Sequence, residues 1–274
     1  MSTALANIGP VMLVGAGKMG VALAQGWLDA GLPPNNLIIV HPRPGEALLA
    51  LAQDYDLTLS SQASGLTPNV LVVGVKPQVI DEVLESLAPV IAPHTLVVSI
   101  AAGIDLARLS RKADTQRVVR TMPNTPVQVR KGITGVVAGP EVTAEDRVAI
   151  DSLFSASGMV VWLDEEAQLD ALTAVSGSGP AYVFHMVEAL AAAGRRQGLP
   201  DVVADQLARG TVIGAAALMD AVTLSPSVLR ENVTSPKGAT AAGLAVLMAE
   251  PGLTDLMDRT VSATRQRTEE LGRL

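Results

Sequence analysis

The sequence predicts an α/β protein, in which a doubly wound parallel sheet is followed by an all-helical domain. Three observations lead to this prediction. Short apolar runs alternate with helical stretches over the first half of the chain, a glycine-rich turn follows the first run, and Ala-rich helical sequence begins after about Glu165. The 274 residues are enough for two domains, each with its own core. We expect these domains to span residues 1–166 and 167–274.

The expected strands are short apolar runs bounded by Gly, Pro or polar residues. They are Val11–Val14, Leu37–Val40, Val70–Val75, Leu96–Ile100, Val118–Val119, Ile133–Val137 and Met159–Leu163. The clearest helices between them are Met19–Ala30, Gly45–Gln53, Ile80–Leu87 and Ala144–Ser155. Because strands that alternate with helices connect through crossovers, the sheet should be largely parallel. Thr143, with Asp146 three residues later, is expected to cap the last of these helices.

The second half of the chain is expected to be helical almost to its end. Residues that stop helices, chiefly Gly and Pro, separate its segments. The segments are Gln168–Val175, Ala181–Gln197, Asp201–Ala221, Ser225–Asn232, Thr240–Ala249 and Leu253–Leu271. Ala-rich faces on these helices suit either the core of a bundle or an interface between subunits, and the sequence leaves both open.

Composition argues against several classes of protein. The formal net charge is −7 and no Lys/Arg run is present, so a nucleic-acid partner is not expected. The apolar runs appear broken before the roughly 20 residues that span a bilayer, and the chain start does not look like a signal peptide. We therefore expect no membrane segment and a cytoplasmic location. Cysteine is absent and the three histidines are far apart in sequence, so neither disulfides nor a metal site are expected.

The glycine-rich turn fits the G-x-G-x-x-G pattern of a Rossmann-like, NAD(P)-binding domain. Its residues are Gly15, Ala16, Gly17, Lys18, Met19 and Gly20. The first glycine makes the tight turn, the second lets the pyrophosphate approach the backbone, and the third lets helix and strand pack closely. The pattern alone is weak, but its place between the first strand and the first helix favours cofactor binding over an ordinary glycine turn.

Residues after three other strands are also expected near the cofactor. An NAD-specific enzyme usually ends its second strand with Asp or Glu, whereas here His41 takes that place and Arg43 follows. A guanidinium suits the 2′-phosphate of NADPH, so we expect NADPH, with NADH as the alternative. Arg43 as a solvated loop charge is the other interpretation. Lys76-Pro77 and Ala101–Gly103 follow two further strands, although a surface lysine at a helix entrance would look like Lys76.

Two loops of the helical domain run small residues directly into a predicted helix. They are Ser176–Pro180 and Ser235–Thr240. Free backbone N–H groups at a helix start, with hydroxyl groups beside them, suit an anion such as a substrate carboxylate. The alternative is two well-capped helix starts without a ligand. Together with the glycine turn, the two loops indicate hydride transfer to a small anionic substrate.

These motifs form an ordered set that resembles the pyrroline-5-carboxylate reductase family over essentially the whole chain. Beyond the glycine turn, the matching segments are Gly74–Pro77, Val98–Gly103, Arg120–Pro126, Ser176–Tyr182 and Glu231–Thr240. The resemblance implies that the protein is an NAD(P)H-dependent enzyme that reduces the cyclic imine 1-pyrroline-5-carboxylate to L-proline, the last step of proline biosynthesis. It also implies a homo-oligomer, a dimer or larger, assembled through the helical domain.

The resemblance also assigns roles to residues. Besides the glycine turn, the implied cofactor contacts are Ser61, Val75, Lys76, Pro77, Ala101, Ala102, Gly103, Asn124 and Asn232. The implied substrate site is Ser178, Gly238, Ala239 and Thr240, with Thr240 as the catalytic residue whose hydroxyl meets the ring nitrogen. The chain departs from the family at Lys237, where a glycine often stands. That departure adds a cation that would favour a carboxylate.

The implied chemistry needs no strong general acid, because an imine is basic enough to be protonated near neutral pH. Two other functions stay open. A two-domain reductase of 2-oxo or 3-hydroxy acids would need an acid/base group, for which Lys237 is the candidate. A sensor that binds the cofactor without turnover would show binding but no substrate-dependent oxidation.

Overall fold

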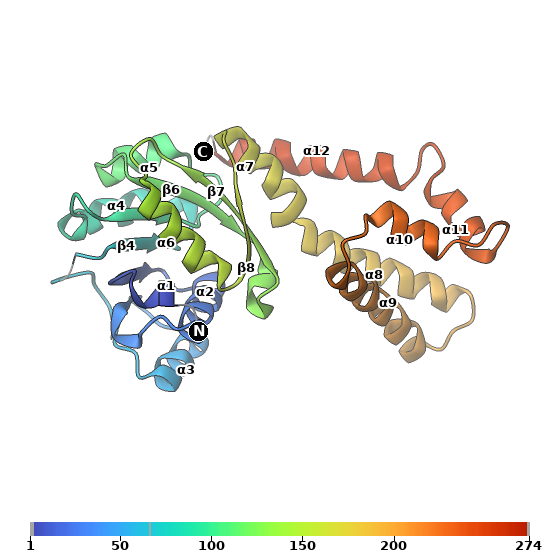
Figure 1. The fold of residues 1–274 in the computed structure, drawn as a ribbon, viewed down its shortest axis with the longest axis horizontal. Coiled ribbons are helices and arrows are strands. Elements are labelled where there is room, and N and C mark those ends of the chain that lie inside the picture. Colours follow the sequence, from blue (N-terminus) through green and yellow to red (C-terminus); the bar gives the residue numbers. More distant parts are fainter. Residues whose placement is uncertain (1–2, 66, 273–274) are drawn as a thin grey trace. The chain divides into compact units, whose positions relative to one another are not determined.

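The computed structural model describes residues 3–65 and 67–272 and divides the chain into two compact units. Unit 1 comprises Met1–Gly177 together with Arg265–Leu274, and unit 2 comprises Ser178–Thr264. Unit 1 carries the sheet and unit 2 is helical (Figure 1). This division differs from the expected boundary after residue 166. The reason is that α7 (Glu166–Leu172) packs on the sheet and the end of the last helix returns to the same unit.

Unit 1 is built on one sheet, in which eight strands of the described residues lie in the order β3-β2-β1-β4-β5-β6-β7-β8. The strands are β1 (Val11–Val14), β2 (Leu37–Val40), β3 (Leu59–Ser60), β4 (Val70–Val73), β5 (Leu96–Ser99), β6 (Val118–Pro123), β7 (Gly132–Ala138) and β8 (Gly158–Trp162). The first six are parallel, and β7 pairs with β6 in the antiparallel sense. The doubly wound, largely parallel sheet is thus confirmed. Its strand order reverses between β1 and β4, where folds of this kind bind dinucleotides.

Helices precede the first strand and lie between several of the others. They are α1 (Thr3–Ala6), α2 (Lys18–Asp29), α3 (Glu46–Tyr55), α4 (Ile80–Leu87), α5 (Leu106–Ala113) and α6 (Ala144–Ser155). The four helices expected in this half are all present. The expected cap of α6 is confirmed, because the Thr143 hydroxyl accepts a bond from the Asp146 N–H and the Asp146 carboxylate accepts one from the Thr143 N–H.

Both faces of the sheet are buried, as β1 illustrates. Val11 and Leu13 belong to a core cluster that includes Trp27 of α2. The alternate residues Met12 and Val14 belong to a second cluster. Successive side chains of a strand point to opposite faces, so a strand that is covered on both sides consists of consecutive apolar residues. This burial explains why the strands could be recognised as short apolar runs.

Unit 2 has few buried residues. Its helices are α8 (Gly179–Arg196), α9 (Asp201–Ala221), α10 (Pro226–Asn232), α11 (Ala239–Leu247) and the first part of α12 (Leu253–Gly272). Of its described residues, only Ala191, Ala204 and Ala208 are buried, while large apolar side chains such as Phe184 and Ile213 are exposed. One copy of unit 2 therefore leaves its apolar faces open, and patches of this kind mark interaction surfaces.

The length and composition of α9 bear on the expectation that the chain has no membrane segment. Among the described residues it is the one helix that is long and apolar enough by those two criteria, and 11% of its apolar stretch is buried within the structure. Asp205 and Arg209 interrupt its apolar residues in the first half of the helix, and Gly210 and Gly214 follow them. Core helices of water-soluble proteins meet the same two criteria.

Candidate functional site

The glycine turn joins β1 to α2, and its three glycines meet different surroundings. Gly15 has φ +83°, and a Cβ there would lie 2.5 Å from Val75 Cγ1. A Cβ on Gly17 would meet nothing within 4 Å, whereas one on Gly20 would lie 3.4 Å from the Gly15 carbonyl oxygen. The first glycine is therefore required by the turn, the second leaves open space, and the third lies close to the strand, as the motif predicts.

The start of α2 fits a pyrophosphate. Gly17 is the N-cap residue and provides no side-chain cap, and no acidic residue lies in the first turn. The first N–H groups of a helix have no partner within the helix, and they carry the positive end of the helix dipole. The residues of this turn therefore fit a dinucleotide cofactor, with the backbone of the first turn as the anion site.

Three of the predicted residues lie close together at the C-terminal ends of β2 and β3. β3 pairs with β2, so that Val40 lies opposite Ser60. The His41 N–H donates to the Ser60 carbonyl at 2.8 Å, and the Arg43 N–H donates to His41 Nδ1 at 3.2 Å. Ser61 follows directly, so His41, Arg43 and Ser61 lie near one another, and the Arg43 side chain is exposed.

The ends of β4 and β5 lie beside the glycine turn. The Gly74 N–H donates to the Val14 carbonyl at 2.7 Å, and the Ile100 N–H donates to the Val73 carbonyl at 3.1 Å. The segments Val75–Pro77 and Ala101–Gly103 therefore follow the C-terminal ends of their strands, beside the glycine turn. The Lys76 side chain is exposed, and no ion pair is found for it among the described residues.

Asn124 has a structural role that the sequence did not reveal. Its side chain is buried, its amide nitrogen donates to the Ser176 carbonyl at 3.0 Å, and its amide oxygen accepts from the Ile133 N–H at 2.8 Å. These bonds tie the end of β6 to β7 and to the π-helical turn Thr173–Gly177. Only the second hydrogen of the side-chain amide and the backbone of Asn124 therefore remain for the predicted contact with the cofactor.

The predicted substrate residues lie at helix ends of unit 2. α11 begins after Gly238, which provides no side-chain cap, so the N–H groups of its first turn are free to bind an anion. Thr240 lies in that turn and is exposed. Lys237 has φ +60°, a conformation that favours glycine. Ser178 precedes α8, again without a side-chain cap, and Asn232 is the last residue of α10.

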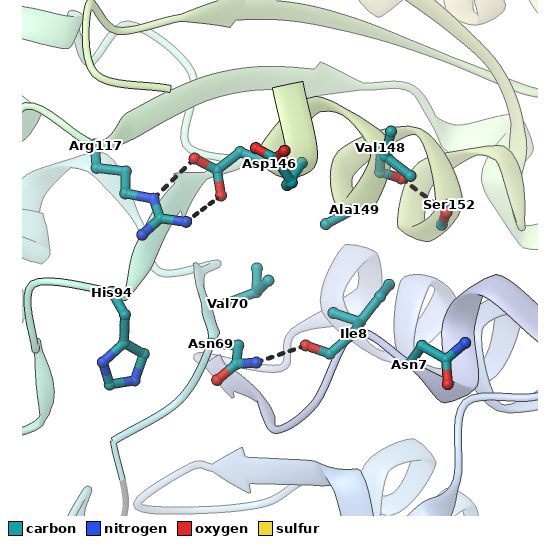
Figure 2. A pocket seen from close by; sticks show the side chains of 11 residues that line it. Asn7, Ile8, Asn69, Val70, His94, Arg117, Asp146, Val148, Ala149 and Ser152 are labelled. Atoms are coloured by element: carbon teal, nitrogen blue, oxygen red, sulfur yellow. Dashed lines mark hydrogen bonds and ion pairs between the residues drawn. The ribbon is translucent and has the colours of Figure 1, made fainter. Parts of the chain in front are cut away.

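A cavity of about 460 Å³ lies at the N-terminal end of the parallel strands (Figure 2). None of the predicted site residues lines it. It lies where β4 begins, whereas the glycine turn lies where β1 ends. Figure 2 shows Arg117 facing Asp146 at its rim, with Nε–Oδ2 and Nη2–Oδ1 distances of 2.8 and 2.6 Å. This bidentate pair joins the start of β6 to the start of α6, so its role is structural.

Replacing Asp146 by asparagine is expected to lower the free energy of unfolding by about 3 kcal/mol, because the buried pair would be broken and Arg117 left uncompensated. Burial raises the pKa of the Asp146 carboxyl, but the Arg117 guanidinium and the Thr143 N–H outweigh burial and hold that pKa below its ordinary value. A depressed carboxyl pKa stabilises the fold above its unfolded-state value, about 3.9, and this stability is lost as the pH falls through the lower, folded-state value.

Thermal melts between about pH 3 and pH 7 measure this effect. The wild type should lose stability on acidification more steeply than Asp146→Asn. Glu141→Gln, which changes an exposed carboxylate in the preceding loop, serves as the control and should melt like the wild type. Identical melts for all three proteins would show that the Arg117 pair contributes no stability.

Comparison with known proteins adds independent findings. Residues 166–271 match the family described as pyrroline-5-carboxylate reductase dimerisation, and residues 10–103 match the family described as NADP oxidoreductase coenzyme F420-dependent. The chain is 38% identical over 264 residues to the pyrroline-5-carboxylate reductase of Pseudomonas aeruginosa, which covers 95% of this chain and 96% of that relative.

Two solved structures have a similar fold over nearly all of the chain. A pyrroline-5-carboxylate reductase from Coxiella burnetii has a TM-score of 0.90 and 32% identity, with 97% of this chain and 99% of that chain covered. A pyrroline carboxylate reductase from Plasmodium falciparum, solved with NADP bound, has a TM-score of 0.79 and 26% identity, with 96% and 98% covered. The sequence, the fold and the site motifs therefore point to the same group of proteins.

Proposed function

The chain belongs to the pyrroline-5-carboxylate reductase family, and we propose that it reduces 1-pyrroline-5-carboxylate to L-proline in an NADPH-dependent reaction. The observation that carries this proposal is that α2 and α11 each begin after a glycine, with no side-chain cap and no acidic residue in the first turn. The start of α2 suits a pyrophosphate, and the start of α11 suits a carboxylate. A reductase that brings a dinucleotide to a small anionic imine needs both.

The cofactor residues proposed for this chain come after the C-terminal ends of the parallel strands. The backbone of Gly15–Gly20 would hold the pyrophosphate, and Val75–Pro77 and Ala101–Gly103 would flank it. When bound, NADPH supplies the hydride that adds to C5 of the pyrroline ring. Asn232 of unit 2 and Ser61 stay proposed contacts on the family resemblance alone.

The start of α11 is the proposed binding site for the substrate. Its free N–H groups would hold the carboxylate through Gly238 and Ala239, and Ser178 would add a hydroxyl. Thr240 would orient the ring nitrogen with its exposed hydroxyl. Because the imine is protonated by solvent near neutral pH, these residues need only bind and orient the substrate, and correct orientation alone is worth roughly 7–11 kcal/mol.

Arg43 is proposed to bind the 2′-phosphate that distinguishes NADPH from NADH. Replacing Arg43 by alanine should raise the KM for NADPH about tenfold, since a hydrogen bond between charged groups contributes about 1.5–3 kcal/mol. The KM for NADH should change little, because NADH lacks that phosphate. Arg43→Lys keeps the charge and should lie between the two. Steady-state kinetics with each cofactor tests this, and equal changes for NADPH and NADH would remove Arg43 from the site.

The exposed apolar faces of unit 2 are proposed to pack against another copy of the chain, so that the enzyme is at least a dimer. Two observations support this assembly rather than contact with lipid. Residues 166–271 match a dimerisation family, and the exposed apolar side chains occur on several helices besides α9. A cytoplasmic location is part of the same proposal.

The experiment that tests the proposed function is NADPH oxidation by the purified protein, with 1-pyrroline-5-carboxylate and with a panel of 2-oxo acids. Oxidation that depends on the pyrroline supports the proposal. Oxidation with a 2-oxo acid alone would favour the other type of reductase, for which Lys237 would be the acid/base candidate. Cofactor binding without oxidation of NADPH by any substrate would indicate a sensor.

A further inference from the structure

Arg120 of β6 is a buried cation inside the sheet of unit 1. Its side chain is 7% exposed, and in the strand register it lies between Ser99 of β5 and Val137 of β7. An unpaired guanidinium in such a place would carry a large desolvation penalty. The penalty is offset by two carboxylates, because Nη1 lies 3.0 Å from Glu166 Oε1 and Nη2 lies 3.0 Å from Asp170 Oδ1.

The two carboxylates differ in what else they contact. Glu166 Oε1 also accepts a hydrogen bond from the Leu106 N–H at 2.8 Å. Leu106 is the first residue of α5, which begins shortly after the segment Ala101–Gly103. Among the side-chain hydrogen bonds of the described residues, the Asp170 carboxylate accepts one from Arg120 alone. Glu166 therefore connects the buried cation to the backbone that follows the proposed cofactor segment, and Asp170 does not.

The same segment is held from another side by the end of α12. Gly103 has φ +76°, and a Cβ there would lie 3.4 Å from the Gly272 nitrogen. A Cβ on Gly272 would in turn lie 3.1 Å from the Gly103 carbonyl oxygen. Both glycines line a cavity of about 230 Å³, whose other lining side chains are polar or charged. Ala101 and the adjoining Ile104 are anchored in a core cluster, whereas the start of α5 that follows is also held by polar bonds such as the one from the Leu106 N–H to Glu166.

We propose that Glu166 is a positioning residue for the cofactor. Held in place by Arg120, its carboxylate fixes the start of α5 and thereby the segment Ala101–Gly103 that would contact NADPH. The inference rests on the proposed function, which assigns this segment to the cofactor site. Asp170 serves only to balance the charge of Arg120.

The test is the Kd for NADPH, measured by fluorescence titration without substrate in four variants of the full-length protein. Glu166→Ala loses the bond to the Leu106 N–H and should bind NADPH about fivefold more weakly, the effect of one hydrogen bond of about 1 kcal/mol. Glu166→Gln keeps an oxygen acceptor at that place and should bind like the wild type. Asp170→Ala should melt at a lower temperature, as Glu166→Ala does, yet keep the wild-type Kd.

Leu106→Pro removes the N–H group itself and leaves the Arg120 cluster intact. Proline is favoured at the first position of a helix, and Asp105 before it already has an extended backbone, with φ −79° and ψ 161°. This variant should weaken NADPH binding as Glu166→Ala does, and it stands in for that variant if Glu166→Ala does not fold. The inference is overturned if Asp170→Ala or Glu166→Gln loses as much affinity as Glu166→Ala, or if Leu106→Pro binds normally.

The two hypotheses fail separately. Absence of pyrroline-dependent NADPH oxidation in the wild type would refute the proposed function. The ratio of Kd values among the variants tests the role of Glu166 without any turnover.

Discussion

Replacing Thr240 by alanine is expected to lower kcat for 1-pyrroline-5-carboxylate reduction by about 100-fold. Thr240 lies in the first turn of α11, next to the N–H groups proposed to hold the carboxylate, and its exposed hydroxyl has no hydrogen-bond partner among the described residues. That hydroxyl is available to orient the ring nitrogen. Removing one well-placed donor from an active site typically lowers kcat by roughly 10²–10³. Steady-state kinetics at saturating NADPH measures the effect.

Two controls separate this effect from damage to the fold. Thr240→Ser keeps the hydroxyl and should retain most of the activity. Thr240→Ala should melt at the wild-type temperature and bind NADPH normally, because its side chain is exposed and the proposed cofactor turn lies in unit 1. Wild-type turnover in Thr240→Ala would remove this residue from the catalytic site.

Replacing Gly17 by valine should weaken NADPH binding about 100-fold, equivalent to roughly 2.7 kcal/mol, without lowering the melting temperature. A Cβ at this position meets nothing within 4 Å, and φ is −74°, so the fold accepts a side chain there. The valine would occupy the space through which the pyrophosphate approaches the first N–H groups of α2. Fluorescence titration with NADPH and thermal melting measure the two quantities.

Gly15→Ala provides the contrast. At φ +83°, with Val75 Cγ1 only 2.5 Å from the added carbon, this substitution should lower the melting temperature as well as the affinity for NADPH. Normal NADPH binding by Gly17→Val would mean that the pyrophosphate does not bind at this turn.

Much of the fold could be predicted because the strands of the sheet are buried on both faces. A strand such as Val70–Val73 consists of consecutive apolar residues and is easily recognised. β3 was missed because two residues, Leu59 and Ser60, are too few to show a pattern, and their pairing with β2 depends on tertiary structure. The two compact units divide after Gly177 and not after residue 166, because α7 is helical in sequence whereas its Leu169 is buried in unit 1.

The candidate site was predicted unevenly. Motifs made of consecutive residues, such as Gly15–Gly20 and Gly238–Thr240, could be recognised because their chemistry follows from local backbone geometry. The roles of Asn124 and Arg120 could not, because each depends on partners about fifty positions away in the sequence. An arginine inside an otherwise apolar strand was the one available signal of a buried charge cluster.

The most direct test of the proposed reaction is the transfer of deuterium from NADPH that is dideuterated at C4 of the nicotinamide. The purified protein is supplied with 1-pyrroline-5-carboxylate, and the product is analysed by mass spectrometry. We expect L-proline that carries a single deuterium at C5 of the ring. Unlabelled product, or oxidation of the cofactor without formation of proline, would contradict the proposed reaction.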